Sequence, residues 1–320
     1  MRMIDRRSFL QRAAALAAAG ALMPRSASAL GARHPGRLPI GFSTLGCPKW
    51  GWTAVVEYAA AHKFAAIELR GILDIVDLTT LPEFQPARLA RTKRDLDDYE
   101  LVISDLGAST NLHETDPVKA PAGIAEARGF IDLASRLGVP YVRVFGNKFI
   151  PGMTREQSLE RISAALRSLG EYAREKNVEV LLETHGDFTD SPTVLEIMRR
   201  ADSKGAAVLW DAHHTFVFGK EAPETSALQL GPYIRHVHLK DSVPAGTGDD
   251  RRYVLTGKGD VPVRRQVEAL AKLKYAGYYN FEWEKRWHPE IEEPEVAFAH
   301  FSEIVSSFML IAGVEPLHTG

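Results

Sequence analysis

Short apolar runs rich in β-branched and aromatic residues alternate along the chain with longer stretches of helical character. The runs predict strands near residues 38–43, 65–69, 100–105, 140–145, 178–184, 206–211, 234–239 and 278–283. Helices are expected over residues 53–62, 85–98, 122–137, 156–176, 192–202, 263–273 and 294–310. Such alternation predicts parallel strand pairing through right-handed crossovers. Eight units in a chain of 320 residues therefore predict one α/β domain, a closed (β/α)8 barrel.

The start of one predicted helix can be placed from its residues. Ser191 is expected to be the N-cap, because a serine hydroxyl accepts hydrogen bonds from the free N–H groups at a helix start. Pro192 then takes the first helical position, where the missing N–H of proline leaves no hydrogen bond unmade.

The first 29 residues resemble an export signal rather than part of the fold. Arg6 and Arg7 precede an apolar stretch over residues 13–23, and Ala27-Ser28-Ala29 has the small-x-small form of a cleavage site. Twin arginines before a weakly apolar core are typical of Tat export. The apolar stretch is far shorter than the roughly 20 residues that cross a bilayer. We therefore expect a signal peptide over residues 1–29, a barrel domain over residues 30–320, a periplasmic or secreted protein, and no stable membrane insertion after cleavage.

The charge of the remaining chain argues against a nucleic-acid partner. Removing the signal removes five arginines and one aspartate, which changes the formal net charge from −2 to −6. Nucleic-acid binding depends on clustered lysines and arginines, and no basic cluster remains. The lone Cys47 excludes an internal disulfide and is expected to be a small buried residue. The sequence is compatible with a homo-oligomer but does not predict one.

Four of the predicted strands end at, or next to, a residue that can bind a metal. These residues are Glu183, Asp211, His238 and Glu282. The C-terminal ends of the strands meet at one mouth of a (β/α)8 barrel, so we expect the four side chains to converge there. Three carboxylates and one imidazole suit a single divalent ion such as Mn, Co, Mg or Zn.

The alternation of side chains along a strand sharpens this hypothesis. His236, His238 and Lys240 share one face of their strand and are expected to point into the barrel, while Val237 and Leu239 pack against the helices. Of the two histidines, His238 lies nearer the mouth. We expect His236 to lie deeper, as a residue that supports the site without binding the metal.

Four stretches of the chain are similar to one known superfamily. They read Leu-Leu-Glu183-Thr-His185-Gly, Trp-Asp211-Ala-His-His214, His-Val-His238-Leu-Lys240-Asp241 and Gly277-Tyr-Tyr-Asn-Phe-Glu282. The chain resembles the xylose isomerase-like TIM barrels, which include sugar phosphate isomerases, ketose epimerases, inosose dehydratases and apurinic endonucleases. The resemblance implies that Glu183, Asp211, His238 and Glu282 are the metal ligands and that His214 and Arg143 contact substrate. The chain departs from similar ketose epimerases at Thr189, where they have a further glutamate.

The resemblance also implies a chemistry for the site. A divalent ion can polarise a sugar carbonyl and stabilise the enediolate that forms when the neighbouring C–H bond is broken. In related epimerases the first and last glutamates are both ligands and acid/base groups, which assigns these roles to Glu183 and Glu282. His185 and His214 are rival bases, because imidazole titrates near neutral pH.

Several further residues are candidates for contact with substrate. Lys240 or Arg143 would stabilise a developing oxyanion. Lys240 would alternatively pair with Asp241 and have no chemical role. Trp283 and Arg286, and His213 beside His214, are candidates for sugar contacts, although ordinary packing explains a tryptophan there equally well.

We therefore expect a metal-dependent isomerase or epimerase acting on a small-molecule sugar. An exported enzyme is expected to use a non-phosphorylated sugar or keto-sugar, because sugar phosphates are made and used mainly inside cells. The alternatives are a lyase or dehydratase that eliminates across the same enolate, for example on an oxidised glycoside, and a sugar-binding barrel without activity.

Overall fold

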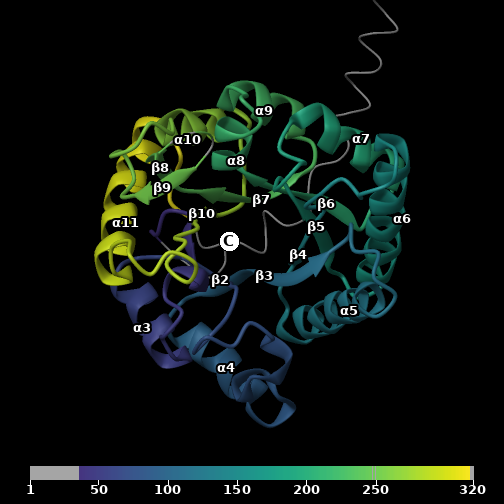
Figure 1. Ribbon diagram of the computed structural model, residues 1–320. Coiled ribbons are helices and arrows are strands. Elements are labelled where there is room, and N and C mark those ends of the chain that lie inside the picture. Colours follow the sequence, from purple (N-terminus) through teal and green to yellow (C-terminus); the bar gives the residue numbers. More distant parts are fainter. Residues whose placement is uncertain (1–35, 247, 249, 318–320) are drawn as a thin grey trace, which may run out of the picture.

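A closed barrel of eight parallel strands forms the centre of the molecule, with helices around it (Figure 1). The computed structural model describes residues 36–246, 248 and 250–317, and the expected signal peptide over residues 1–29 lies outside these ranges. The barrel strands are β1 (Ile40–Ser43), β2 (Ala66–Leu69), β3 (Val102–Asn111), β4 (Tyr141–Phe145), β5 (Glu179–Glu183), β6 (Ala206–Asp211), β7 (Ile234–Leu239) and β10 (Tyr279–Phe281). Pairing of β1 with both β2 and β10 closes the barrel. The predicted (β/α)8 barrel is confirmed.

Helices cover the outside of the barrel (Figure 1). The longer ones are α3 (Trp52–Ala61), α4 (Pro86–Asp98), α5 (Lys119–Leu137), α6 (Arg155–Arg174), α7 (Ser191–Ala201), α10 (Val263–Lys272) and α11 (Pro294–Ile311). All seven were predicted. Two short helices after β6 were not predicted, α8 (Ala212–Val217) and α9 (Pro223–Leu230), because neither is long enough to show a helical period. Single 3-10 turns are formed by Thr44–Gly46, Leu78–Thr80 and Pro82–Phe84.

The main hydrophobic core lies between the barrel and the helices. Phe281 of β10 stacks on Phe301 of α11 with ring centroids 4.3 Å apart, and Phe42 of β1 stacks on Phe298 at the same distance. Stacked aromatic pairs add to the free energy gained by burying their apolar surface. Cys47 is buried in this core, as the sequence predicted.

A smaller apolar cluster of Leu181, Ala207 and Leu209 is separate from the main core. These residues alternate along β5 and β6 with others that face the helices, so they fill the inside of the barrel. Glu183 and Asp211 follow on the same faces, two residues nearer the mouth. The apolar lower barrel therefore supports a polar layer above it.

The start of α7 differs from the predicted boundary. The N-cap is Asp190, whose carboxylate accepts a hydrogen bond from the Thr193 N–H at 2.9 Å, and Ser191 is already helical. The hydroxyl of Ser191 instead donates to Glu221. Both aspartate and serine are good N-caps, and proline fits either of the first two helical positions, so the sequence could not decide between them.

A two-stranded hairpin follows β7 and was not predicted. It consists of β8 (Asp241–Pro244) and β9 (Arg251–Val254). The carboxylate of Asp241 accepts hydrogen bonds from four backbone N–H groups, those of Ser242, Gly257, Gly259 and Val261. Asp241 therefore holds the loop after β7 in place and is not the partner of Lys240.

The two ends of the described chain meet at the floor of the barrel. Gly36 donates a backbone hydrogen bond to Leu317, and Leu317 donates one to Arg37. Leu317 packs against Ala66 and Tyr278, at the N-terminal ends of β2 and β10. The mouth, where the strands end, lies at the opposite end of the barrel.

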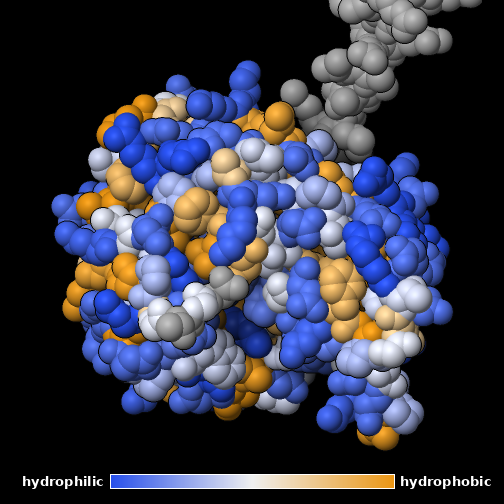
Figure 2. All heavy atoms as spheres, turned by 45° about the horizontal axis from the view of Figure 1, so that its top comes forward, coloured by the Kyte–Doolittle hydropathy of each residue, from blue (hydrophilic) through white to orange (hydrophobic). Residues whose placement is uncertain are grey.

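Hydrophilic residues dominate the face of the molecule shown in Figure 2, with smaller hydrophobic patches between them. Among residues 36–246, 248 and 250–317, no helix combines the length and the apolar character that crossing a membrane requires.

Candidate metal centre

The structure brings Glu183, Asp211, His238 and Glu282 together at the barrel mouth. Each offers one ligand atom, and these atoms lie within 4.8 Å of one another. The Nδ1 atom of His238 lies 3.3 Å from Glu282 Oε2, 3.8 Å from Glu183 Oε1 and 3.9 Å from Asp211 Oδ2. All four residues are buried. The barrel thus concentrates three carboxylates and an imidazole around one point.

Asp211 has a second contact that orients its carboxylate. Its Oδ1 accepts a hydrogen bond from the His214 N–H at 3.0 Å and so caps α8. Its Oδ2 is turned toward His238. A carboxylate at a strand end is often only a helix cap, and here one oxygen caps the helix while the other faces Lys240 and His238.

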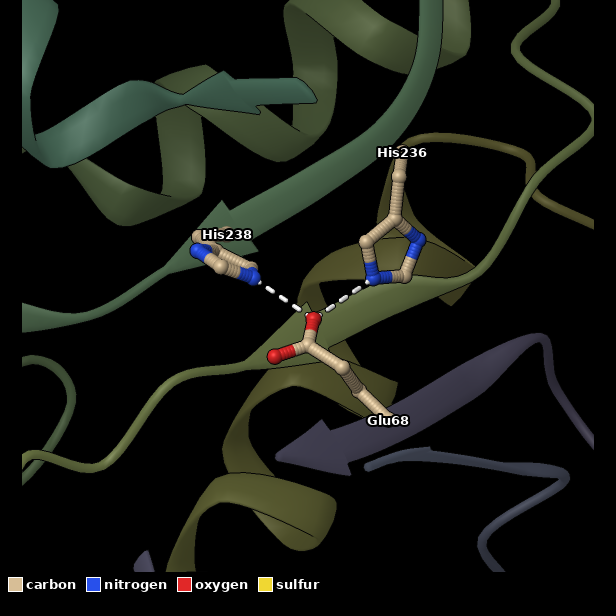
Figure 3. A group of neighbouring side chains, drawn as sticks. All are labelled: Glu68, His236 and His238. Carbon is tan, nitrogen blue, oxygen red and sulfur yellow. Dashed lines mark hydrogen bonds and ion pairs between the residues drawn. The ribbon is translucent and has the colours of Figure 1, made fainter. Parts of the chain in front are cut away.

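Glu68 orients the imidazole of His238 from across the barrel (Figure 3). Its Oε2 accepts hydrogen bonds from His238 Nε2 at 2.6 Å, His236 Nε2 at 2.9 Å and Asn280 Nδ2 at 3.1 Å. Because Nε2 of His238 donates to Glu68, Nδ1 is the ring atom directed at the carboxylates, and loss of its proton would give it a lone pair there. Within the described residues that Nδ1 has no hydrogen-bond partner.

The role of Glu68 was not predicted. The sequence shows a charged residue at the end of an apolar strand, which is the only available signal. His236 does lie deeper than His238 and contacts Glu68, which agrees with the supporting position expected for it.

Opposing charges set the ionisation of this layer. Burial disfavours charge on Glu183, but the neighbouring Arg143 guanidinium, whose Nε lies 3.0 Å from Glu183 Oε2, lowers the pKa of the carboxyl to about 2. Burial raises the pKa of Asp211 to about 6, although Lys240 opposes the rise. Burial likewise disfavours an imidazolium at His238, yet the carboxylates of Glu282 and Glu68 raise its pKa well above the ordinary value. The carboxylates and the cations of this layer therefore stabilise one another's charges.

Lys240 lies fully buried between three carboxylates. Its Nζ lies 2.8 Å from Asp211 Oδ2 and 2.8 Å from Glu284 Oε1, and it also contacts Glu282. The alternative pairing of Lys240 with Asp241 is therefore wrong.

A cavity of about 300 Å³ opens beside the four residues. Glu183 and Glu282 line it, together with Arg143, His185 and His214. The Nδ1 of His185 lies 3.0 Å from Asn147 Oδ1, and that of His214 lies 3.1 Å from the carbonyl oxygen of Thr184. Burial lowers the pKa of His214 well below its ordinary value, so its imidazole is neutral at pH 7.

A larger cavity of about 430 Å³ lies at the floor of the barrel, where its walls include Leu96, Val139 and Ile234. None of the four converging residues lines it. The cavity at the mouth is the better candidate for a site of chemistry despite its smaller volume, because two of the four converging residues, Glu183 and Glu282, line it.

Three residues expected to contact substrate do not line the cavity at the mouth. Trp283 is fully buried against Phe281, and its Nε1 donates to the carbonyl oxygen of Glu292, so the packing interpretation is correct. Arg286 pairs with Asp74 at 2.7 Å. His213 is fully buried with its Nε2 2.7 Å from Ser242 Oγ. Alternation along an extended chain turns Trp283 away from the cavity that its neighbour Glu282 lines.

A comparison with protein families identifies the fold family. The family described as xylose isomerase-like TIM barrel matches residues 56–302. The chain belongs to this family. Among curated proteins, none matches the sequence.

Three solved structures are similar to this chain. The probable 3-DHS dehydratase AsbF, involved in petrobactin synthesis, from Bacillus anthracis has 18% identity and a TM-score of 0.70, over 84% of this chain and 99% of that one. An L-ribulose 3-epimerase has 16% identity and a TM-score of 0.69, over 86% of this chain and 95% of that one. The IOLI protein with a zinc atom has 17% identity and a TM-score of 0.69, over 86% of this chain and 99% of that one. At these identities the likeness shows the fold.

Proposed function

We propose that the protein is a divalent-metal-dependent enzyme that isomerises or epimerises a non-phosphorylated sugar or keto-sugar. The observation that supports this most strongly is the convergence of Glu183, Asp211, His238 and Glu282 beside an open cavity. The similar structures include an L-ribulose 3-epimerase and a zinc-bound protein, which favours the same chemistry here. Export by the Tat route stays a prediction from residues 1–29.

The four residues suit a divalent cation. Carboxylate oxygens suit Mg and Mn, and imidazole nitrogen suits borderline ions such as Zn. Within the described chain, His238 Nδ1 makes no hydrogen bond, whereas Asp211 Oδ2 and Glu183 Oε2 each face one cation, Lys240 Nζ at 2.8 Å and Arg143 Nε at 3.0 Å. Buried polar atoms without such partners are costly unless a ligand satisfies them. A bound divalent ion would act as a Lewis acid toward a sugar carbonyl in the adjoining cavity.

The proton on the neighbouring carbon would pass to residues of the cavity wall. Glu183 and Glu282 both line the cavity and are proposed to hold the substrate hydroxyls and exchange the proton. His214 is the rival base, because Nδ1 lies against the Thr184 carbonyl and the neutral ring keeps a lone pair on Nε2. His185 lies beside it, with ring centroids 4.8 Å apart.

Hydrogen exchange in heavy water tests the proposed function. Metal-loaded protein would be incubated with a panel of free ketoses and keto-sugar acids, and the recovered sugars analysed by NMR and mass spectrometry. We expect deuterium on the carbon next to the carbonyl, together with the epimer or isomer. If no sugar exchanges with any of Mn, Co, Mg or Zn, and sugar binding needs no metal, the barrel is a binding protein.

A lyase or dehydratase is the second candidate. Thr189 stands where similar ketose epimerases have a further glutamate, so their substrate contacts are not all present. A probable dehydratase is among the similar structures. In the same experiment, loss of water or of an aglycone, with little epimer, would favour elimination.

Metal affinity is expected to rise with pH. A metal binds the deprotonated ligands, and the raised pKa values of His238 and of Asp211, the latter about 6, mean that protons must leave first. Near pH 7 we expect about one proton to be released for each metal ion bound, and below pH 6 about two. For each proton released, metal affinity should fall about tenfold when the pH is lowered by one unit. Calorimetry in buffers of different ionisation enthalpy measures this release. Equal affinity at pH 5.5 and pH 8 would contradict the proposed ligand set.

Glu68→Gln is expected to weaken metal binding by about 10- to 100-fold. The substitution replaces an acceptor of three hydrogen bonds with an amide that cannot hold both histidines, and His238 then loses its orientation. Metal titration measures the loss. His236→Gln is the matched control, because His236 shares the same oxygen but lies outside the ligand set, and it should change metal affinity much less. Equal effects of both substitutions would assign Glu68 only to general packing.

A further inference from the structure

Arg70 places a guanidinium in the cavity wall without a counter-ion. It follows β2 directly, and its backbone N–H donates to Thr44 Oγ1 at 2.9 Å. In the side chain, Nη2 donates to Ser109 Oγ at 3.0 Å, whereas Nη1 has no hydrogen-bond partner in the described chain. Arg70 is only 7% exposed. A buried cation with free hydrogen-bond donors is unfavourable unless something else occupies its open side.

The nearest acidic groups are used elsewhere. Glu126 accepts hydrogen bonds from the Ser109 N–H at 3.1 Å and from Thr110 Oγ1 at 2.9 Å. Glu183 is paired with Arg143, and Glu282 with Lys240. Within the described residues, no carboxylate comes within ion-pair distance of Arg70. The protein itself therefore leaves this charge unneutralised.

A second arginine lies against the first. A Cβ atom on Gly107 would lie 2.8 Å from Arg143 Nη2 and 2.8 Å from Arg70 Cδ, so both side chains cross this backbone position, which only glycine leaves open. Arg143 is fixed, because its Nη1 donates to the Ala108 carbonyl at 2.9 Å and its Cζ lies 4.0 Å from the centre of the Phe145 ring. Burial and the nearby Arg143 lower the pKa of Arg70 to about 10, so it remains protonated at neutral pH.

We propose that Arg70 and Arg143 form a subsite for a carboxylate of the substrate. The substrate would then be a sugar acid, such as a uronate or a keto-sugar acid, rather than a neutral sugar. This inference rests on the proposed function, because both arginines line the same cavity as Glu183 and Glu282. A planar carboxylate matches the fork of donors on a guanidinium.

A carboxylate fits this wall better than a phosphate. Glu183, Glu282 and Glu284 line the same cavity, so a dianion would meet more repulsion there than a monoanion. Ser109 and Asn111, at the end of β3, add neutral polar groups beside Arg70. The shared chemistry is an oxyanion, and its source is decided by experiment.

Binding of matched probes tests the subsite. D-fructuronate and D-fructose, D-galacturonate and D-galactose, and inorganic phosphate would be titrated into metal-loaded protein by calorimetry. We expect at least one acid to bind about tenfold or more tighter than its neutral partner, and more tightly than phosphate. Arg70→Met should remove this preference and leave the neutral sugar within about twofold, and Arg70→Lys should keep part of it.

Two comparisons make the result decisive. Arg286→Met is the control, since Arg286 lies outside the cavity and is paired with Asp74, and it should preserve the preference for the acid. Melting temperatures check folding, and Arg70→Met should melt no lower than wild type because the removed charge has no ion pair. If Arg70→Met does not fold, Arg70→Lys and Arg143→Lys must each weaken binding of the acid by several fold.

The outcomes separate this inference from the proposed function. The inference is overturned if acids and neutral sugars bind equally, if phosphate binds most tightly, or if Arg70→Met weakens both members of a pair alike. Deuterium exchange into neutral sugars, unchanged by Arg70→Met, would overturn the subsite and leave the proposed function intact. Binding of an acid that depends on Arg70, without exchange or elimination under any metal, would keep the subsite and overturn the function.

Discussion

Glu183→Gln and Glu282→Gln are each expected to lower deuterium exchange into substrate by about a thousandfold or more. Glutamine keeps the shape of the side chain but removes a charged metal ligand and a proton acceptor at once. Both positions line the cavity and face Nδ1 of His238. Exchange should be measured at saturating metal, so that weaker metal binding alone does not explain the loss.

Substitutions of His214 and His185 test whether a histidine, rather than a glutamate, is the base. If His214 is the base, His214→Asn should lower exchange by about a hundredfold or more with metal affinity unchanged, and the same holds for His185→Asn. Glu224→Gln is the control, because Glu224 lies on the surface and pairs with Arg265. Full deuterium exchange in both Glu183→Gln and Glu282→Gln would contradict the proposed chemistry at this site.

Lys240→Met is expected to destabilise the metal-free protein by about 3–5 kcal/mol. The substitution leaves Asp211, Glu282 and Glu284 buried without the cation that they share. Urea unfolding in the presence of a chelator measures the change in the free energy of unfolding. Lys258→Met, on the exposed surface, should leave it unchanged.

Metal should rescue the Lys240→Met variant more than it stabilises wild type. A divalent ion held by Asp211 and Glu282 supplies the positive charge that the variant lacks, and binding to the folded state raises stability by mass action. A larger metal-induced rise in melting temperature for the variant is therefore expected. If Lys240→Met lowers the free energy of unfolding of the metal-free protein by less than about 1 kcal/mol, Lys240 is not needed to keep the three carboxylates buried.

The ends of the barrel strands could be predicted well from the sequence. Glu183, Asp211, His238 and Glu282 each stop or follow an apolar strand, and parallel strands place such positions at one mouth whatever the details of packing. The inward face of His236, His238 and Lys240 likewise followed from alternation alone. These features depend on local pattern and on topology, which a sequence carries directly.

Contacts between distant strands could not be predicted in this way. Glu68 meets His238 across 170 positions of sequence, and nothing near either residue indicates the other. Arg70 directly follows an apolar strand in the sequence, but its lack of a counter-ion depends on where Glu126, Glu183 and Glu282 direct their own oxygens. The positions of Trp283 and Arg286 depended on how the last loop turns, which local pattern leaves undetermined.

The junction of Gly36 with Leu317 has a practical consequence. It lies at the pole of the barrel remote from the substrate entrance, so a fusion partner or surface tether joined ahead of Gly36 starts on the far side. Molecules immobilised through that end would all present their openings to the surrounding solution, and diffusion of small ligands into them would stay unobstructed.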